Sequence, residues 1–453
     1  MPVSVIVIFD VGKTNKKVLL FDKQYKLLEE ESIQLEETID EDGFSCENVN
    51  ELKQWVEQKF SQILSKKDMV IKAVNFSAYG ASFVHVNEEL SPVTPLYNYL
   101  KPYPENLKKQ FYNTYGGERL IAKQTASPVL GSLNSGMQLY RLKYEKPGIY
   151  DQIKYSMHLP QYISSIISQK PAADISSVGC HTNLWDFKKN DYHDWVYKEE
   201  LNKKFGPLHT GDKIIETLKD NDGILAGIGL HDSSAALIPY LFSFREPFIL
   251  ISTGTWCISL NPFNHSELSD EELKKDCLCY LSYEGKPVKA SRLFAGYEHE
   301  QQVKRLAAHF NKAALGYQSV GYNRELMDKA QRIGKIKQIP FPEADLSEFK
   351  TYEEAYHQLM YGIIKQQIKS TKLVLNETNV KRIFVDGGFG NNPIYMQLLS
   401  KALPDMEVYS AMIPQASALG AALAIHKHWN DYPLPSDLIV LKYYANTEIN
   451  HST

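Results

Sequence analysis

Apolar and polar positions along the chain follow two alternating patterns, one typical of strands and one typical of helices. Short apolar runs predict strands at residues 3–9 and 17–21 and within 382–390. Apolar residues three and four positions apart predict helices at 49–63 and 352–375. Strands and helices that alternate along a chain in this way are typical of an α/β protein.

The C-terminal part adds two predicted helices. Asn392 and Pro393 form a suitable N-cap and first-turn pair for a helix over residues 394–403. Another helix begins near Gln415, and its small residues allow a neighbouring backbone to approach closely. After Asp431 we expect a loosely held end.

The first predicted strand leads into Gly12-Lys13-Thr14, a triplet that ends many ATP-binding P-loops. The full P-loop motif needs a second glycine five positions earlier, where this chain has Val7, and a helix after the turn. The residues that follow, "KKVLLFD", predict a strand instead. The sequence therefore predicts a β-turn-β unit here and not a P-loop.

This layout recurs roughly half a chain later. The segment "PFILISTGTWCISL", Pro247 to Leu260, has an apolar strand, a polar turn with one glycine, and a second apolar strand. Coincidence between two common hairpins is the alternative, but the matching threonine and glycine turns favour a duplication. We therefore predict two similar domains, residues 1–243 and 244–453, that face each other across a cleft.

Composition agrees with this division and narrows the class of protein. A chain of 453 residues is too long for a single core. A net charge of −4 without a basic block argues against nucleic acid as the main partner. No apolar stretch approaches the ~18 residues of a membrane-spanning helix, and the N-terminus is typical of a buried strand rather than a signal peptide.

The cysteines indicate neither a disulfide framework nor a zinc site. They are few and scattered, and the close pair Cys277 and Cys279 lacks the partners that a zinc site needs. We therefore expect reduced thiols in a cytoplasmic protein.

Both polar turns carry groups that suit phosphate. A glycine turn lets the backbone approach a ligand and directs N–H groups at it, and the neighbouring threonine and asparagine side chains add donors. Two such turns on opposite walls would hold one polyphosphate. Asp10, at the end of the first strand, makes sense beside an anion if Mg²⁺ lies between them.

Taken together and in order, "DVGKTN", "STGTW" and "VDGGFGNNPIYMQLL…QASALGAALA" resemble the FGGY family of carbohydrate kinases. The resemblance covers nearly the whole chain, although each motif alone is weak. It implies an α/β fold of two ribonuclease-H-like, actin-like ATPase domains, with ATP and Mg²⁺ in the cleft between them.

The resemblance also implies site residues, position by position. Lys17 stands where many family members have arginine, so the charge is kept and the planar fork is lost. Asp10 and Asp232 would lie near the metal. The implied nucleotide contacts are Gly12, Lys13, Thr14, Asn15 and Lys17 in the first phosphate segment, Thr253, Gly254 and Thr255 in the second, and Gly387, Gly388, Asn391 and Asn392 around adenosine.

Asp232, in "GIGLHDSSAALIPYL", is the implied catalytic residue. Phosphoryl transfer to an alcohol needs a carboxylate that accepts the hydroxyl proton, and the small residues after Asp232 leave room for a sugar. Without the resemblance, Asp232 would be interpreted as a helix N-cap, and the two roles are compatible.

The sugar contacts are expected in the N-terminal half, where tyrosine faces and polar groups would orient a sugar ring. Core aromatic residues and satisfied hydroxyls are the alternative for each, and for the two histidines a structural role. The family's aromatic-x-Asp-x-Arg pattern is replaced by Tyr99 and Lys101, and Ser82 stands where rhamnulokinase-like members carry Asp. The candidates are Ser77, Tyr79, Ser82, His181, Asn183 and His231.

The resemblance thus implies an ATP-dependent kinase for a sugar hydroxyl, probed best with ketoses such as rhamnulose, fuculose or xylulose. The sugar itself is left open. A homodimer is also left open, and neither nucleic acid nor a membrane is expected as partner. The alternatives are a catalytically silent sugar or nucleotide sensor and a chaperone-like or filament-forming ATPase.

Overall fold

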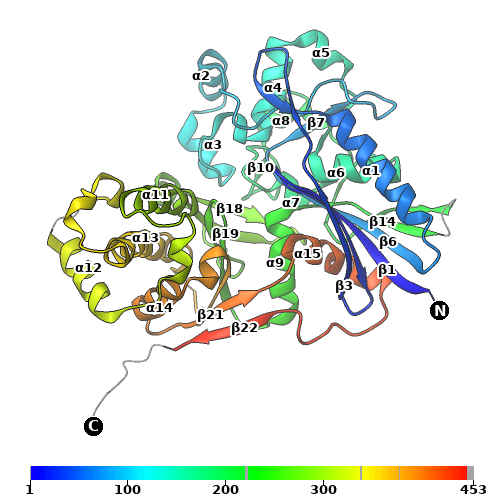
Figure 1. Cartoon of the computed structure of the whole chain (residues 1–453). Coiled ribbons are helices and arrows are strands. Elements are labelled where there is room, and N and C mark those ends of the chain that lie inside the picture. The colour runs from blue at the N-terminus through cyan, green and yellow to red at the C-terminus, as the bar shows by residue number, and fades with distance from the viewer. Residues whose placement is uncertain (1, 220–222, 337–338, 377, 446–453) are drawn as a thin grey trace.

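The computed structural model describes residues 2–219, 223–336, 339–376 and 378–445. These residues form two lobes, each built around a mixed sheet with helices packed on it (Figure 1). The α/β fold with two ribonuclease-H-like domains is confirmed, whereas the boundary predicted between residues 243 and 244 stays a prediction.

The N-terminal lobe contains the opening hairpin at the centre of its sheet. β1 pairs with β2 antiparallel and with β6 parallel. The sheet order is β13 (Ile214–Leu218), β14 (Ile224–Gly227), β6 (Met69–Ala78), β1 (Val3–Val11), β2 (Lys16–Asp22) and β3 (Leu27–Ile33), with β15 (Leu230–His231) also paired to β6.

The C-terminal lobe repeats this arrangement. β16 pairs with β17 antiparallel and with β20 parallel, as β1 does with β2 and β6. The sheet order is β18 (Cys277–Leu281), β19 (Pro287–Leu293), β17 (Cys257–Asn261), β16 (Phe248–Thr253), β20 (Arg382–Gly387), β21 (Glu407–Met412) and β22 (Val440–Tyr444). The shared topology favours duplication over coincidence.

Helices cover both sheets, and short strands form small additional ladders. The helices are α1 (Val49–Leu64), α2 (Glu105–Thr114), α3 (Glu118–Gln124), α4 (Ser135–Glu145), α5 (Pro147–Gln152), α6 (Leu159–Ser168), α7 (Ile175–Val178), α8 (Asp194–Lys198), α9 (Asp232–Ser243), α10 (Asp270–Lys274), α11 (Ala295–His309), α12 (Arg324–Ile336), α13 (Tyr352–Leu375), α14 (Pro393–Ala402), α15 (Ala416–Ala424) and α16 (His426–Trp429). The remaining strands are β4 (Glu37–Ile39), β5 (Ser45–Glu47), β7 (Phe83–Val86), β8 (Tyr155–His158), β9 (Ala173–Asp174), β10 (Trp185–Asp186), β11 (Asp191–Tyr192) and β12 (Leu208–His209).

The strongly patterned elements lie where the sequence predicts them. The helix predicted at 352–375 is α13, and Asn392 caps α14 by accepting the N–H groups of Ile394 and Tyr395. The expectation of a loosely held end after Asp431 is wrong for part of that segment, because β22 pairs along β21 and closes that edge of the sheet. Residues 446–453 lie outside the described chain.

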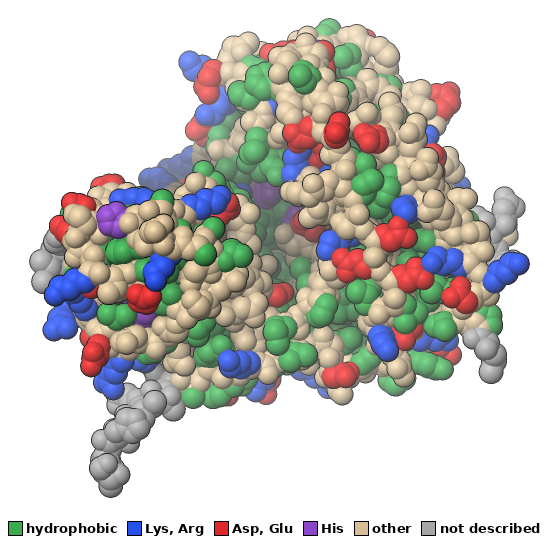
Figure 2. Space-filling model, viewed as in Figure 1, with side chains coloured by type: hydrophobic (Ala, Val, Ile, Leu, Met, Phe, Trp, Pro, Cys, Tyr) green, Lys and Arg blue, Asp and Glu red, His purple; other side chains and the backbone are tan. Residues whose placement is uncertain are grey.

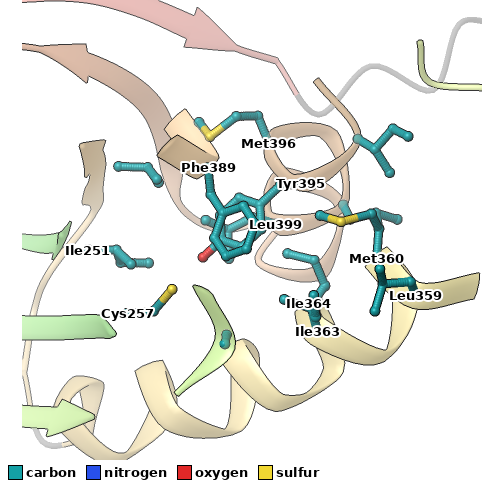
Figure 3. Packing of buried hydrophobic residues seen from close by; sticks show 14 of the residues in the cluster. Ile251, Cys257, Leu359, Met360, Ile363, Ile364, Phe389, Tyr395, Met396 and Leu399 are labelled. Atoms are coloured by element: carbon teal, nitrogen blue, oxygen red, sulfur yellow. The ribbon is translucent and has the colours of Figure 1, made fainter. Parts of the chain in front are cut away.

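The outer face of the C-terminal sheet packs on α13 and α14 in a dry core. Figure 3 shows Phe389 and Tyr395 stacked there, with Met360 from α13 and Ile251 from β16 nearby. This packing fixes the end of β20 and the start of α14, which border the second polar turn.

The inner faces of both sheets pack on one pair of helices, α9 and α15, which lie side by side between the lobes (Figure 1). Ile6 and Ile8 of β1 and Leu250 of β16 belong to this single shared core. The helices cross so closely that a Cβ on Gly420 would lie 1.8 Å from the carbonyl oxygen of Ala235. Glycine is therefore required at this crossing.

We predict that Gly420→Ala destabilises the protein, because the added methyl group forces α9 and α15 apart. The expected loss is about 1–3 kcal/mol, measured by thermal or denaturant unfolding. Gly362→Ala is the matched control, since Gly362 lies within α13 and a Cβ there would meet nothing within 4 Å. That control should gain about 0.5–1 kcal/mol from helix propensity. Equal stability of Gly420→Ala and the wild type would contradict the close crossing.

Candidate active site

Asp10 is the second-last residue of β1, on the same face of the strand as Ile6 and Ile8 of the inner core. Its Oδ2 accepts a hydrogen bond of 2.8 Å from the hydroxyl of Ser417, in the first turn of α15. Burial raises the pKa of Asp10 to about 6 against the effect of this bond, and repulsion from Asp232 adds to the increase. The two carboxylates are therefore electrostatic neighbours.

Asp232 is the first residue of α9, and His231 occupies the N-cap position before it. The N–H of Ser233 donates to Asp232 Oδ1 over 2.5 Å, and His231 Nε2 lies 3.3 Å from the same oxygen. The side chain keeps 36 % of its surface open to the cleft. Protein on its other sides removes enough hydration to raise its pKa to about 6.

Two helices of opposite halves of the chain thus begin beside the same pair of carboxylates. The N-terminal ends of α9 and α15 carry partial positive charge, which favours anions near them. Figure 2 shows the surface hollowed between the two lobes, with histidine side chains inside the hollow. A crevice with two carboxylates and two helix N-termini is suited to a magnesium-bound phosphate.

The first polar turn, residues 12–15, lies directly beyond Asp10. The N–H of Gly12 donates to the carbonyl of Asn15, which closes the turn, and Thr14 is exposed. Lys17 donates to the side chain of Gln415, just before α15, and pairs with Glu30. The turn is therefore anchored to both β3 and the start of α15.

Two side chains of this turn already have protein partners. The ammonium group of Lys13 lies 2.9 Å from Glu37 and 3.1 Å from Glu47. Asn15 accepts a hydrogen bond from Gln34. The predicted nucleotide contacts of Lys13 and Asn15 stay predictions, and contact through the backbone N–H groups is compatible with these bonds.

The second polar turn is joined to the glycine loop after β20. The hydroxyl of Thr253 donates to the carbonyl of Asp386 and accepts the N–H of Phe389 over 3.0 Å. Gly387 has φ +84°, and a Cβ there would lie 2.0 Å from the carbonyl of Thr253. Gly387 therefore allows the two backbone segments to meet without a side chain between them.

A pocket of about 720 Å³ opens beside this junction. It is lined by the turn at residues 253–255, by residues of α11, by residues 314–318 before α12, and by the loop and helix start after β20. This volume is typical of sites for small molecules such as a nucleoside. The predicted adenosine and phosphate residues that line it are Thr253, Gly254, Thr255, Gly388, Asn391 and Asn392, whereas Gly387 is not part of the lining. The lining also includes Gly296, His299 and Tyr317.

Among the predicted sugar residues, His231 directly precedes Asp232, and His181 lies near the same tyrosine ring as His231. The rings of His181 and His231 lie 6.1 and 6.0 Å from the ring of Tyr280 in β18. Burial lowers the pKa of His181 to about 3 and that of His231 to about 4, so both imidazoles are neutral at pH 7. Tyr79 donates its hydroxyl to Glu47 over 2.6 Å. Neutral rings and hydroxyls are suited to an uncharged sugar.

The remaining candidates for sugar contacts, Ser77, Ser82 and Asn183, are buried side chains. Ser77 is the strand neighbour of Asp10 in β6, and its hydroxyl lowers the pKa of Asp10. Ser82 is buried, with no hydrogen-bond partner for its hydroxyl among the described residues. Asn183 accepts from Thr125 and is buried, so its contact with a sugar stays a prediction.

Several residues of the site were missed by the sequence patterns. Ser417, Tyr280 and Gln415 come from distant parts of the chain, so only the folded structure brings them to Asp10 and Asp232. Lys16, the buried first residue of β2, could have been found from the sequence. Side chains alternate along a strand, so Lys16 lies on the opposite face of β2 from Lys17.

The donors at Asp10 and Asp232 fit Mg²⁺. Among the described residues, no group of three or more His, Cys, Asp or Glu side chains is placed to hold a metal. Mg²⁺ commonly binds one or two carboxylates and takes its other ligands from phosphates and water. Asp10 and Asp232 would supply those carboxylates.

Comparison with protein-family models identifies the family to which the chain belongs. The N-terminal domain of the FGGY family of carbohydrate kinases matches residues 5–238, and the FGGY C-terminal domain matches residues 245–432. The chain belongs to the FGGY family of carbohydrate kinases. It is accordingly a phosphotransferase of a family that acts on sugar hydroxyls and uses ATP.

Solved structures of FGGY kinases share the fold over nearly the whole chain. A carbohydrate kinase from Novosphingobium aromaticivorans has a TM-score of 0.80 at 19% identity, covering 98% of this chain and 95% of its own. A ligand-bound xylulose kinase from Lactobacillus acidophilus has 0.79 at 15% identity, covering 98% and 94%. A glycerol kinase from Plasmodium falciparum with ADP has 0.73 at 14% identity, covering 94% and 90%.

No curated protein matches this chain significantly. Among the helices of the described residues, none has the length and apolar character needed to span a membrane.

We predict that Asp232→Asn is more stable than the wild type at pH 8. The folded-state pKa of Asp232, about 6, is above its ordinary value of 3.8, so the folded protein bears the cost of the buried charge above pH 6. The cost disappears as pH falls through 6 towards 4. The difference in Tm between variant and wild type should therefore shrink over that range.

The matched control is Asp270→Asn. Its exposed carboxylate pairs with Arg119, which lowers the pKa of Asp270, so this substitution should not raise the Tm at pH 8. A Tm difference for Asp232→Asn that does not change with pH would contradict the raised pKa.

Proposed function

We propose that this FGGY kinase transfers the γ-phosphate of ATP to a hydroxyl of a ketose or related polyol, with Asp232 as general base. The observation that supports this most is that Asp10 accepts a hydrogen bond from Ser417 in the first turn of α15, the helix that crosses at Ala235 the helix α9, whose first residue is Asp232. A catalytically silent sensor would not need both carboxylates, each of which costs stability where it lies.

Asp232 is suited to accept the hydroxyl proton. With a pKa of about 6 it is ionised at pH 7 and still basic enough to take part of a proton in the transition state. The Ser233 N–H orients the carboxylate through its 2.5 Å hydrogen bond. His231 Nε2 lies 3.3 Å from Asp232 Oδ1 and 3.5 Å from Cys180 Sγ, and its buried Nδ1 has no hydrogen-bond partner among the described residues.

Backbone N–H groups would bind the phosphates of ATP. The turn at residues 12–15 in the N-terminal lobe and the turn at Gly254 in the C-terminal lobe would supply N–H groups, and the start of α15 would add its dipole. When bound, Mg²⁺ would neutralise charge that develops on the phosphates. Closure of the lobes would exclude water and so limit hydrolysis of ATP.

The sugar-side loop differs from the family pattern, with Tyr99 and Lys101 in place of the aromatic-x-Asp-x-Arg residues. Lys101 lies buried between Asp40 and Asp42, at 2.5 and 2.7 Å, so its charge is neutralised away from the sugar. The ring of Tyr99 packs edge-on against the ring of Tyr79. Burial raises the pKa of Tyr99, and the negative charge of Asp232 adds to the increase. We infer that Tyr99, rather than Lys101, borders the substrate.

The structural relatives are named as kinases of xylulose, gluconate and glycerol, and the low identities leave the substrate of this chain open. A coupled ADP-release assay with xylulose, ribulose, rhamnulose, fuculose, erythrulose, gluconate and glycerol would identify it. A cytoplasmic location and a homodimer stay predictions.

We predict that Asp232→Asn lowers kcat at least ~100-fold on the best substrate, because the amide that replaces the carboxylate cannot accept the hydroxyl proton. Binding of ADP, measured by calorimetry, should change less than twofold. Asp270→Asn, on the surface, is the control and should retain full activity. Full kinase activity of Asp232→Asn would remove this residue from its catalytic role.

A further inference from the structure

Lys16 follows the first phosphate turn and is one of the most deeply buried large side chains, with 1 % of its surface exposed. Consecutive side chains of a strand point to opposite faces. Lys17 therefore lies on the face of Asp10, its register partner in β1. Lys16 lies on the other face, where Val18 and Leu20 pack under α1.

The ammonium group of Lys16 is surrounded by three oxygens. It donates to the carbonyl of Gly12 over 3.2 Å and to that of Lys13 over 2.9 Å. It also forms an ion pair of 2.8 Å with Glu47 Oε2. Two of the three N–H donors of the ammonium group therefore have hydrogen-bond acceptors, and Glu47 supplies the opposing charge as an ion pair. Burial of this charge is tolerated because it is paired and hydrogen-bonded.

These contacts set the direction of two peptide units. In a trans peptide the C=O and the N–H point in opposite directions. Because the carbonyls of Gly12 and Lys13 point at Lys16, the N–H groups of Lys13 and Thr14 point away from it, towards the face on which Asp10 lies. No acceptor for either N–H is found among the described residues.

Glu47 completes the arrangement. Its Oε1 accepts the hydroxyl of Tyr79 over 2.6 Å and lies 3.1 Å from the ammonium group of Lys13. The carboxylate thereby neutralises Lys16 and ties the phosphate turn to the loop expected to border the sugar.

We propose that Lys16 is a positioning residue for nucleotide phosphates, acting from behind the first phosphate turn. It draws two carbonyl oxygens inward, which removes their negative ends from the cleft and presents two N–H groups to a phosphate. The inference rests on the proposed function, since it requires that phosphates bind at this turn. Lys16 itself does not touch the nucleotide.

The test compares ADP with adenosine by isothermal titration calorimetry on the full chain. Lys16→Met keeps the length of the side chain and removes its charge and donors. We expect the Kd for ADP to rise at least tenfold, or about 1.4 kcal/mol. The Kd for adenosine should stay within twofold, because adenosine occupies the pocket of the C-terminal lobe and does not reach the turn.

Lys289→Met is the matched control. Lys289 is also buried, at 2 % exposure, and pairs with Glu272 over 2.7 Å, away from the nucleotide site. It should leave both affinities unchanged. The double variant Lys16→Met/Glu47→Gln removes both charges of the ion pair together. If Lys16→Met does not fold, the affinities of this double variant for ADP and adenosine are compared instead.

The outcomes separate the two proposals. If a folded Lys16 variant binds ADP as tightly as the wild type, or loses ADP and adenosine equally, the positioning role is wrong. If the wild type binds adenosine and ADP equally well, no phosphate contact exists at the turn and the proposed function fails with it.

Discussion

The close crossing of α9 and α15 is the contact on which the site depends. Gly420 of α15 lies against the backbone of Ala235 in α9, and both sheets pack on this helix pair. The crossing brings the first turns of the two helices together, so Ser417 and Asp232 reach Asp10 from opposite halves of the chain. Because both lobes pack on the same helices, a change in their relative position is transmitted directly to the two carboxylates.

The electrostatics of this junction are unfavourable for folding and suited to catalysis. Asp10 and Asp232 lose hydration and repel each other, and hydrogen bonds from Ser417 and Ser233 offset only part of the cost. Helix N-termini and backbone N–H groups face the same space. Such an arrangement is poised for a ligand that carries both phosphate and a divalent cation, which would relieve the repulsion on binding.

The sequence predicted the elements whose signals are local. The two hairpins, the helix α13 and the cap at Asn392 follow from periodicity and turn chemistry within a few residues. Ser417 and Tyr280 had no such signal, because their meeting with Asp10 and His231 depends on how the two lobes pack. Strand β22 was missed although its sequence, VLKYY, is apolar and aromatic, and four of its five residues are exposed at the edge of the sheet. The roles of the site residues rested on the order of three motifs, each of them weak alone.

A crystal structure of the complex with Mg²⁺, a non-hydrolysable ATP analogue and a sugar that is turned over tests the central claim most directly. We expect the phosphates to lie between the N–H groups of residues 12–15 and those of residues 253–255. We expect the acceptor hydroxyl at about 2.6–3.2 Å from an Asp232 oxygen. Phosphates bound outside this cleft, or an acceptor hydroxyl beside a different base, would contradict it.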